Sequence, residues 1–181
     1  MTIKKKTKVK KKKKTVPKSK RLSRLRKKIL KEWSLKVRER DGNRCIYCGI
    51  EAGALNKNDK KVILNAHHCL SKSIKDSVLK FDTRNGVTLC PSHHKFSGTD
   101  SAHKAPIIFY EWLRNIRPEQ YNFVLQNANL RIDLSDEDVL LEILNQIENG
   151  SGELDMDILN AIVEAKKKPP VEPRETIFDA L

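Results

Sequence analysis

The chain has 181 residues, with 37 lysines and arginines against 23 aspartates and glutamates, and its formal net charge is +14. Hydrophobic residues make up 38% of the chain and aromatic residues 6%, so a folded domain must have a modest core. No run of about 18 apolar residues occurs, which excludes a transmembrane helix, and the basic N-terminus lacks the apolar stretch of a secretory signal. We therefore expect no membrane partner and a cytoplasmic location, in which cysteines stay reduced.

The charge is distributed unevenly along the chain. Residues 1–40 carry a local net charge of +18, residues 41–132 of +5 and residues 133–181 of −9. Residues 1–20 form a lysine-rich arm of low complexity, which we expect to be disordered because its charges repel one another. Such an arm suits a polyanion, above all nucleic acid, since neutralised phosphates release counterions. A solvated tail without a partner is the alternative.

The next segment, residues 21–42, has the period of an amphipathic helix. Apolar residues recur at three- and four-residue steps, with arginine and lysine between them: Leu22, Leu25, Ile29, Trp33 and Val37. This pattern predicts a helix with a basic outer face and an apolar stripe that docks on the domain that follows.

Residues 43–117 contain every cysteine and every histidine of the chain. Residues 61–66 and 86–89 are apolar runs typical of strands, with a long polar segment between them. A helix can begin after the second run, at Pro91 and Ser92. We therefore predict an α+β fold with a small ββα unit, which the basic helix precedes and further helices follow.

Two pairs of residues in this region have the spacing of zinc ligands. Cys45 and Cys48 form a Cys-x-x-Cys pair, and Cys90 and His93 have the same spacing. Two such pairs can surround one Zn²⁺ in a closed tetrahedron, which leaves no position for water and indicates a structural role. The metal would then replace core that this small domain lacks. In the alternative interpretation, unrelated cysteines fill the core.

The C-terminal part of the chain predicts helices. Residues 118–168 have helical periodicity and are acidic from residue 133, and residues 169–181 form a tail. Ser135 followed by Asp138 resembles a capping box at the start of one of these helices. We expect the acidic helices to bind a protein partner or to pack on the rest of the chain.

The histidines provide a second group of chemically active side chains. His67 and His68 are adjacent at the end of a predicted strand, so their side chains should point to opposite faces and serve different purposes. His94 directly follows the proposed zinc ligand His93. The role of His103 is ambiguous, and its surroundings favour a loop or helix-cap role over ligation.

Residues 37–113 resemble the HNH endonucleases of the ββα-metal class, of phage or bacterial type. The resemblance depends on residues 65–68 (Asn-Ala-His-His) and on residues 85–94, which contain the second zinc pair. That pair is usually Cys-x-x-Cys in the family, and position 67 is often aspartate, but both replacements are competent ligands. Some relatives have another metal-binding histidine where this chain has Gly98, which leaves two protein ligands for a catalytic ion.

The resemblance implies hydrolysis of DNA phosphodiester bonds. His68 would be the general base that takes a proton from the attacking water, and Asn85 would orient it through a backbone carbonyl. His67 and His94 would bind one divalent cation that stabilises the phosphorane and the departing 3′ oxygen. Because Mg²⁺ prefers oxygen ligands, a pair of histidines suggests Mn²⁺, Ni²⁺ or a site that also tolerates Mg²⁺.

Three cations near the motifs are candidate contacts to DNA phosphates: Lys72, Arg84 and Lys95. For each of them, a solvated charge is the alternative. Two other functions compete with the nuclease. The chain could be a zinc-containing nucleic-acid-binding module without catalysis, or an adaptor whose acidic helices bind a protein.

Overall fold

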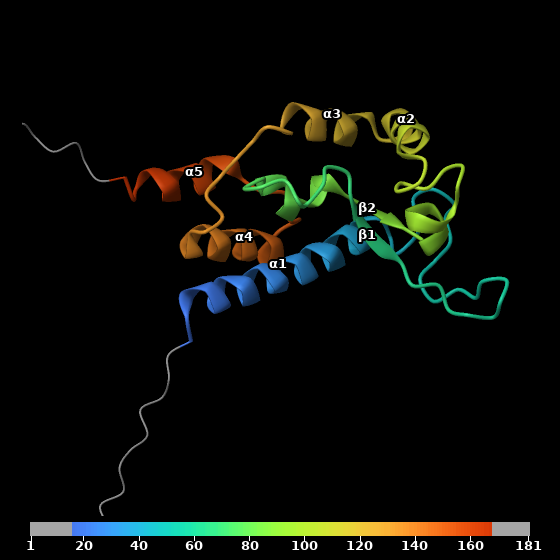
Figure 1. Cartoon of the computed structure of the whole chain (residues 1–181), viewed down its shortest axis with the longest axis horizontal. Coiled ribbons are helices and arrows are strands. Elements are labelled where there is room, and N and C mark those ends of the chain that lie inside the picture. The colour runs from blue at the N-terminus through green and yellow to red at the C-terminus, as the bar shows by residue number, and fades with distance from the viewer. Residues whose placement is uncertain (1–15, 168–181) are drawn as a thin grey trace, which may run out of the picture.

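The computed structural model describes residues 16–167 and shows a mixed fold of helices and one small antiparallel sheet (Figure 1). The predicted α+β class is therefore confirmed. The elements, in chain order, are α1 (Lys18–Arg40), β1 (Asn65–His68), η1 (Val78–Phe81), η2 (Thr83–Asn85), β2 (Gly86–Leu89), η3 (Ser92–Phe96), α2 (Pro106–Ile116), α3 (Pro118–Gln126), α4 (Glu137–Asn149) and α5 (Met156–Glu164). The predicted tail and most of the lysine-rich arm lie outside the described residues.

Helix α1 is the longest element, and α4, both strands, η1 and η2 pack on it. It buries the predicted apolar stripe, at Leu22, Ile29, Trp33 and Val37. The helix begins at Lys18, directly after Pro17, so the end of the predicted arm is helical. No helix within residues 16–167 combines the length and the apolarity that crossing a membrane requires.

The sheet consists of β1 and β2 in antiparallel register, with Asn65 opposite Leu89 and His68 opposite Gly86. Strand β2 has the predicted bounds and is buried along its whole length. The first strand was predicted four residues too early. The reason is that the amide of Val62 donates to the carbonyl of Ala54 at 2.8 Å, so this segment pairs with an upstream loop instead of β2.

Gly86 lets the sheet lie directly on α1. A Cβ atom at this position would come within 2.6 Å of side-chain carbons of both Trp33 and Val37. Only glycine therefore fits without a shift of the helix.

The helix predicted after β2 is much shorter than expected. A single π-helical turn, η3, covers Ser92–Phe96, and the next helix starts only at Pro106. Serine, glycine, threonine and aspartate follow η3 at positions 97–100, and these residues favour turns over helix. The turn is nevertheless sufficient to place two consecutive histidines, as described below.

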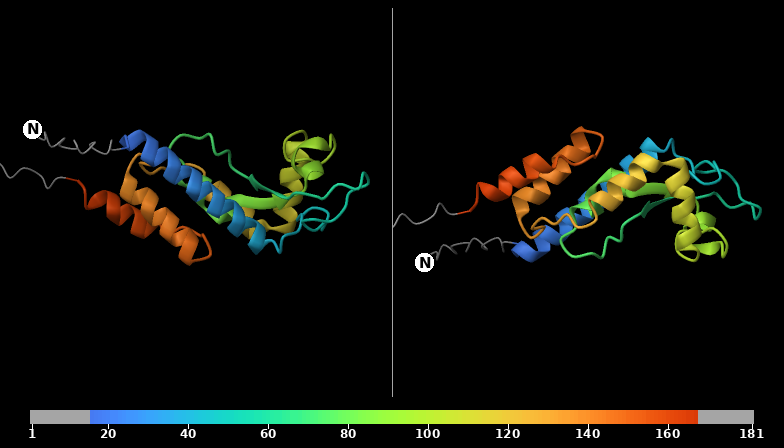
Figure 2. Two further views of the ribbon diagram at one scale, coloured as in Figure 1. Left: turned by 90° about the horizontal axis from the view of Figure 1, so that it is seen from below. Right: turned by 90° about the horizontal axis from the view of Figure 1, so that it is seen from above.

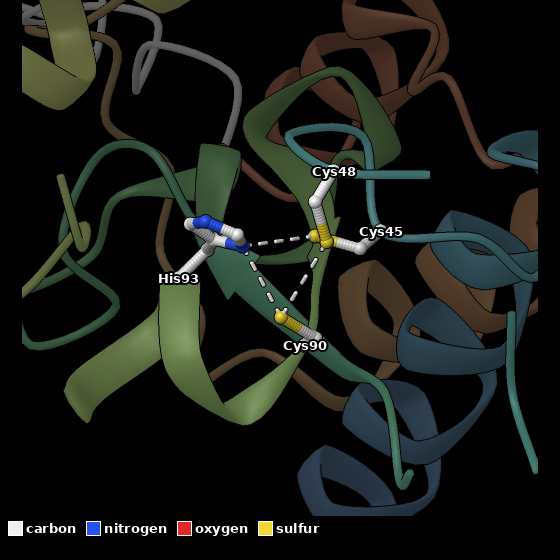
Figure 3. Close-up of side chains that lie close together, drawn as sticks. All are labelled: Cys45, Cys48, Cys90 and His93. Carbon is white, nitrogen blue, oxygen red and sulfur yellow. Dashed lines mark hydrogen bonds between the residues drawn. The ribbon is translucent and has the colours of Figure 1, made fainter. Parts of the chain in front are cut away.

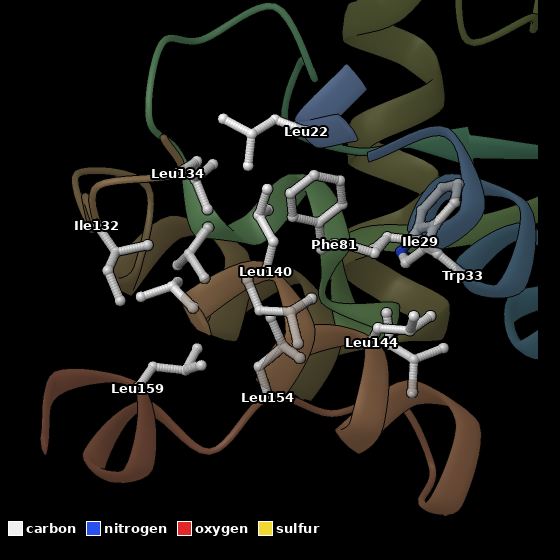
Figure 4. Packing of buried hydrophobic residues seen from close by; sticks show 14 of the residues in the cluster. Leu22, Ile29, Trp33, Phe81, Ile132, Leu134, Leu140, Leu144, Leu154 and Leu159 are labelled. Atoms are coloured by element: carbon white, nitrogen blue, oxygen red, sulfur yellow. The ribbon is translucent and has the colours of Figure 1, made fainter. Parts of the chain in front are cut away.

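Helix α4 packs on α1 and α5 packs on α4, and the apolar core that the three helices share is shown in Figure 4. Helix α4 is capped by Asp136, whose carboxylate accepts from the amides of Asp138 and Val139, so the capping residue predicted at Ser135 was wrong by one position. Arg21 pairs with Glu137 at 3.0 Å, and Lys28 pairs with Glu148 at 2.7 Å. Intramolecular packing is therefore one role of the acidic helices.

Candidate metal centres

The four predicted zinc ligands meet at one point (Figure 3), although they come from two distant segments. The Sγ atoms of Cys48 and Cys90 lie 3.9 Å apart, and Nδ1 of His93 lies 3.2 Å from Sγ of Cys90 and 3.7 Å from Sγ of Cys45. A tetrahedral Zn²⁺ with ordinary bond lengths requires ligand separations of roughly 3.6–3.8 Å. One of the three distances lies in this range and the others within about 0.4 Å of it, and the four donors together could hold a metal ion such as zinc.

Two tight turns present these ligands. The amide of Gly49 donates to the carbonyl of Cys45 at 2.7 Å, and Gly49 adopts a φ of 73°, which favours glycine. The amide of Ile46 donates to the carbonyl of Thr88 at 2.9 Å and so joins this turn to β2. The second pair lies where β2 ends and η3 begins. The cluster thus connects the segment after α1 to the end of the sheet.

The imidazole of His93 is also supported on the side away from the cysteines. Its Nε2 lies 3.7 Å from a carboxylate oxygen of Asp100, and its ring stacks on Tyr47 with centroids 4.3 Å apart. A carboxylate on this side of a histidine ligand leaves the other ring nitrogen to the metal. Here that other nitrogen is Nδ1, which faces the cysteines.

A second cluster unites three histidines: His67, His94 and His103. Their ring nitrogens include a set within 4.8 Å of one another, and the Nε2 atoms of His94 and His103 are 3.2 Å apart. The ring of His67 lies edge-on to both partners, with centroid distances of 5.3 and 5.2 Å. The sequence predicted His67 and His94 as a pair but favoured a loop or cap role for His103. The structure brings His103 to the same point.

Three separate elements carry these histidines. His67 lies on β1, His94 on η3 and His103 on the turn before α2. The turn is fixed by the buried hydroxyl of Ser101, which donates to the carbonyl of Ser97 and accepts from the amide of Lys104. Because the positions of the three elements are set by different contacts, the convergence of the rings depends on tertiary structure.

The second cluster is chemically suited to a cation. His67 is 7% exposed, and its Nε2 is buried without a hydrogen-bond partner among the described residues. Burial, followed by the neighbouring histidines, lowers the pKa of His67 to about 3 and that of His94 to about 4. Both rings are therefore neutral at pH 7 and have lone pairs for a metal. Three imidazoles suit zinc, nickel, iron or copper better than magnesium.

His68 points away from this cluster, as the strand alternation predicted. Its ring stacks on Trp33, with centroids 3.8 Å apart, and its Nε2 lies 3.0 Å from the carbonyl oxygen of Lys80. Since a carbonyl only accepts, Nε2 carries the proton and Nδ1 keeps its lone pair. Burial, and to a smaller extent the charge of Lys72, lowers the pKa of His68 to about 4. His68 is therefore a neutral imidazole of fixed orientation.

Asn85 supports His68 indirectly. This fully buried side chain donates from Nδ2 to the carbonyls of Leu70 and Leu79, both at 3.0 Å, and accepts from the amide of Leu70 at 2.6 Å. It forms no hydrogen bond with the imidazole. The carbonyl that receives His68 belongs to Lys80, the residue after Leu79, so Asn85 fixes the loop that fixes His68.

A cavity of about 540 Å³ connects His68 with the histidine cluster. All four histidines line it, and so do two of the three predicted phosphate contacts, Lys72 and Lys95. The third, Arg84, is elsewhere: its guanidinium binds Asp82 at 2.7 Å and lies over the ring of Phe123. Arg84 therefore lies outside the cavity and packs on Asp82 and Phe123, and its role as a DNA contact stays a prediction.

Two side chains of this region have roles that the sequence does not predict. His103 had no recognisable spacing to the other histidines, and the only signal was that all five histidines fall between residues 67 and 103. Trp33 was assigned to the helix core, where it is indeed buried, but its ring also supports His68.

Comparisons of the chain with protein-family models, curated proteins and solved structures find no match. The description of the site therefore depends on its own residues and not on a relative. It comprises one Cys₃His cluster that can hold a metal ion such as zinc, and one three-histidine cluster that borders a basic cavity.

Proposed function

We propose that this protein is a metal-dependent endonuclease of the HNH type, which hydrolyses DNA phosphodiester bonds beside a structural zinc site. The observation that carries the proposal is the cavity itself. It joins three histidines that converge on one point to a separate, oriented histidine with a free ring nitrogen. This combination supplies metal ligands and a base to the same substrate.

His67, His94 and His103 would hold the divalent cation. When bound, the cation would stabilise negative charge on the phosphorane and on the departing 3′ oxygen. With three protein ligands, coordination positions would remain for water and phosphate oxygens. Of the three cations that the family resemblance suggests, the three-histidine donor set favours Ni²⁺, and Mn²⁺ and Mg²⁺ are the weaker-binding cations to test beside it.

His68 would accept the proton of the attacking water at Nδ1, because Nε2 is engaged with the Lys80 carbonyl. The stack on Trp33 and the hydrogen bond together hold the ring in one orientation. Lys72 and Lys95 line the same cavity and would bind the phosphates on either side of the bond that is cleaved.

A binding module without catalysis is the main competing function. Such a module needs the Cys₃His cluster for stability, but it gains nothing from a second group of converging histidines. An unpartnered ring nitrogen of His67, buried beside two other imidazoles, costs stability unless a ligand satisfies it. This feature favours the nuclease.

The proposal can be tested with a labelled DNA duplex and zinc-loaded full-length protein. We expect cleavage only after addition of Mn²⁺, Ni²⁺ or Mg²⁺, with 5′-phosphate and 3′-hydroxyl ends, because the 3′ oxygen is the leaving group. Supercoiled plasmid serves as a second substrate. A folded, zinc-loaded protein that binds both DNAs and cleaves neither with any of these metals would refute the nuclease.

A further inference from the structure

We propose that the outer face of α1 binds the sugar-phosphate backbone of duplex DNA and holds the duplex beside the cavity. This inference rests on the proposed function in one respect, namely that the polyanion bound by α1 is DNA. Its geometry comes from four exposed cations in one row, named here the α1 stripe: Lys20, Arg24, Lys27 and Lys31.

The α1 stripe is a straight row of charges. Its members are spaced by four, three and four residues, so they lie on one side of the helix over roughly 17 Å. All four are exposed, and none forms an ion pair or a side-chain hydrogen bond with another described residue. At about 3.4 Å per base pair, the row would run along roughly five base pairs.

The acidic part of the fold leaves this row free. Arg21 and Lys28, on the adjacent side of α1, are the cations that pair with α4. The two acidic residues of α1 are Glu32, four residues after Lys28, and Glu39, seven residues after Glu32. At these spacings both share the side of the helix on which Lys28 lies. One flank of α1 is thus neutralised internally, and the α1 stripe is not.

The opposite flank leads to the cavity. Figure 2 (left) shows α1 in front, with α4 on one side and the loop of residues 69–84 on the other. This loop contributes Lys72 to the cavity, and its Lys80 lies close enough to Arg26 that the guanidinium helps to lower the pKa of Lys80. Asp76 is the acidic residue near them. A duplex on the α1 stripe can therefore reach Lys72 without crossing the acidic helices.

The chemistry of the face favours nucleic acid over a lipid surface. An amphipathic helix binds membranes through large apolar side chains on its outer face. The only large apolar residue that continues the row is Leu35, which is 36% exposed, while the apolar stripe of α1 is buried in the core. Charge without an apolar anchor is typical of sequence-independent phosphate contacts.

The test compares two triple variants of the full-length, zinc-loaded protein, without added second metal so that DNA stays intact. R24Q/K27Q/K31Q removes three of the four charges of the α1 stripe, and K57Q/K60Q/K61Q makes the same charge change on an exposed loop. Binding to a DNA duplex is measured by fluorescence anisotropy over a range of salt concentrations. Residues 1–15 contribute nine lysines to the wild type and to both variants. Only the differences in DNA affinity and salt dependence between these proteins are therefore informative.

We expect the stripe variant to bind DNA roughly 10-fold or more weakly, and its slope of log affinity against log salt to be shallower by about 2 to 3, from three lost phosphate contacts. The loop variant should change both quantities much less. Equal losses in the two variants would show that only net charge matters and would overturn the proposal. An unchanged stripe variant would do the same.

Two further arms separate the possible causes. Preferential loss of binding to vesicles that contain phosphatidylserine, with DNA binding intact, would overturn DNA as the partner. Failure of the proposed nuclease is recognised differently, as DNA that is bound through the α1 stripe and never cleaved. Circular dichroism and thermal melting of both variants confirm that the exposed substitutions leave the fold intact.

Discussion

The variant Cys90→Ser is expected to lose at least about 5 kcal/mol of stability, which corresponds to a Tm lower by roughly 10–20 °C. Cys90 is buried and contributes one of four donors to the Cys₃His cluster. The core around it is small, because it is separate from the apolar cluster that α1 shares with α4 and α5. A zinc ion at this cluster therefore supplies stability that burial alone does not.

The matched control is Cys69→Ser, the same chemical change at the cysteine outside the cluster. Differential scanning calorimetry and zinc content, measured by atomic absorption, are recorded for both variants and the wild type. We expect the wild type and Cys69→Ser to contain one more zinc per chain than Cys90→Ser. Full zinc content and unchanged Tm in Cys90→Ser would contradict the structural zinc site.

The second large effect is expected for His103→Ala, which should weaken binding of Ni²⁺ or Co²⁺ at the second cluster roughly 100-fold or more. The His103 imidazole is the third donor there, 3.2 Å from that of His94. Two remaining histidines form a weaker site. Calorimetric titration of zinc-loaded protein measures the affinity, and the visible absorption of bound Co²⁺ reports its ligands without reference to activity.

Lys104→Ala is the control for this experiment, because it alters the exposed neighbour on the same turn and removes no metal donor. It should retain the affinity of the wild type. If His103→Ala also retained that affinity, His103 would not be a ligand, and the second centre would have to consist of His67 and His94 alone.

The contrast between the two clusters shows which parts of a site can be predicted from sequence. The Cys₃His cluster was predictable because each pair is local, and a two-residue spacing fixes the distance between its donors. His103 was not, because its position depends on the turn held by Ser101 and on the start of α2 at Pro106. The number of residues between His94 and His103 predicts neither this turn nor the start of α2.

Secondary structure followed the same division. The periodic segments were predicted well: the apolar stripe of α1, the C-terminal helices and β2 all lie where the pattern indicated. The start of β1 was predicted wrongly because residue 62 pairs with an upstream loop. The length of η3 was not predicted because it depends on the turn residues that follow it. The sequence predicts Arg84 as a phosphate contact because it is a cation near the motifs. The structure shows in addition that its guanidinium pairs with Asp82 and lies over the ring of Phe123.

The central claim is that His68 activates water for DNA cleavage, and relaxation of supercoiled plasmid by the wild type and His68→Ala tests it most directly. We predict that the wild type nicks the plasmid with Mn²⁺, Ni²⁺ or Mg²⁺, and that His68→Ala is at least roughly 100-fold slower although it still binds DNA and the second metal. Equal rates for the two proteins, or an intact plasmid with every metal, would contradict the account.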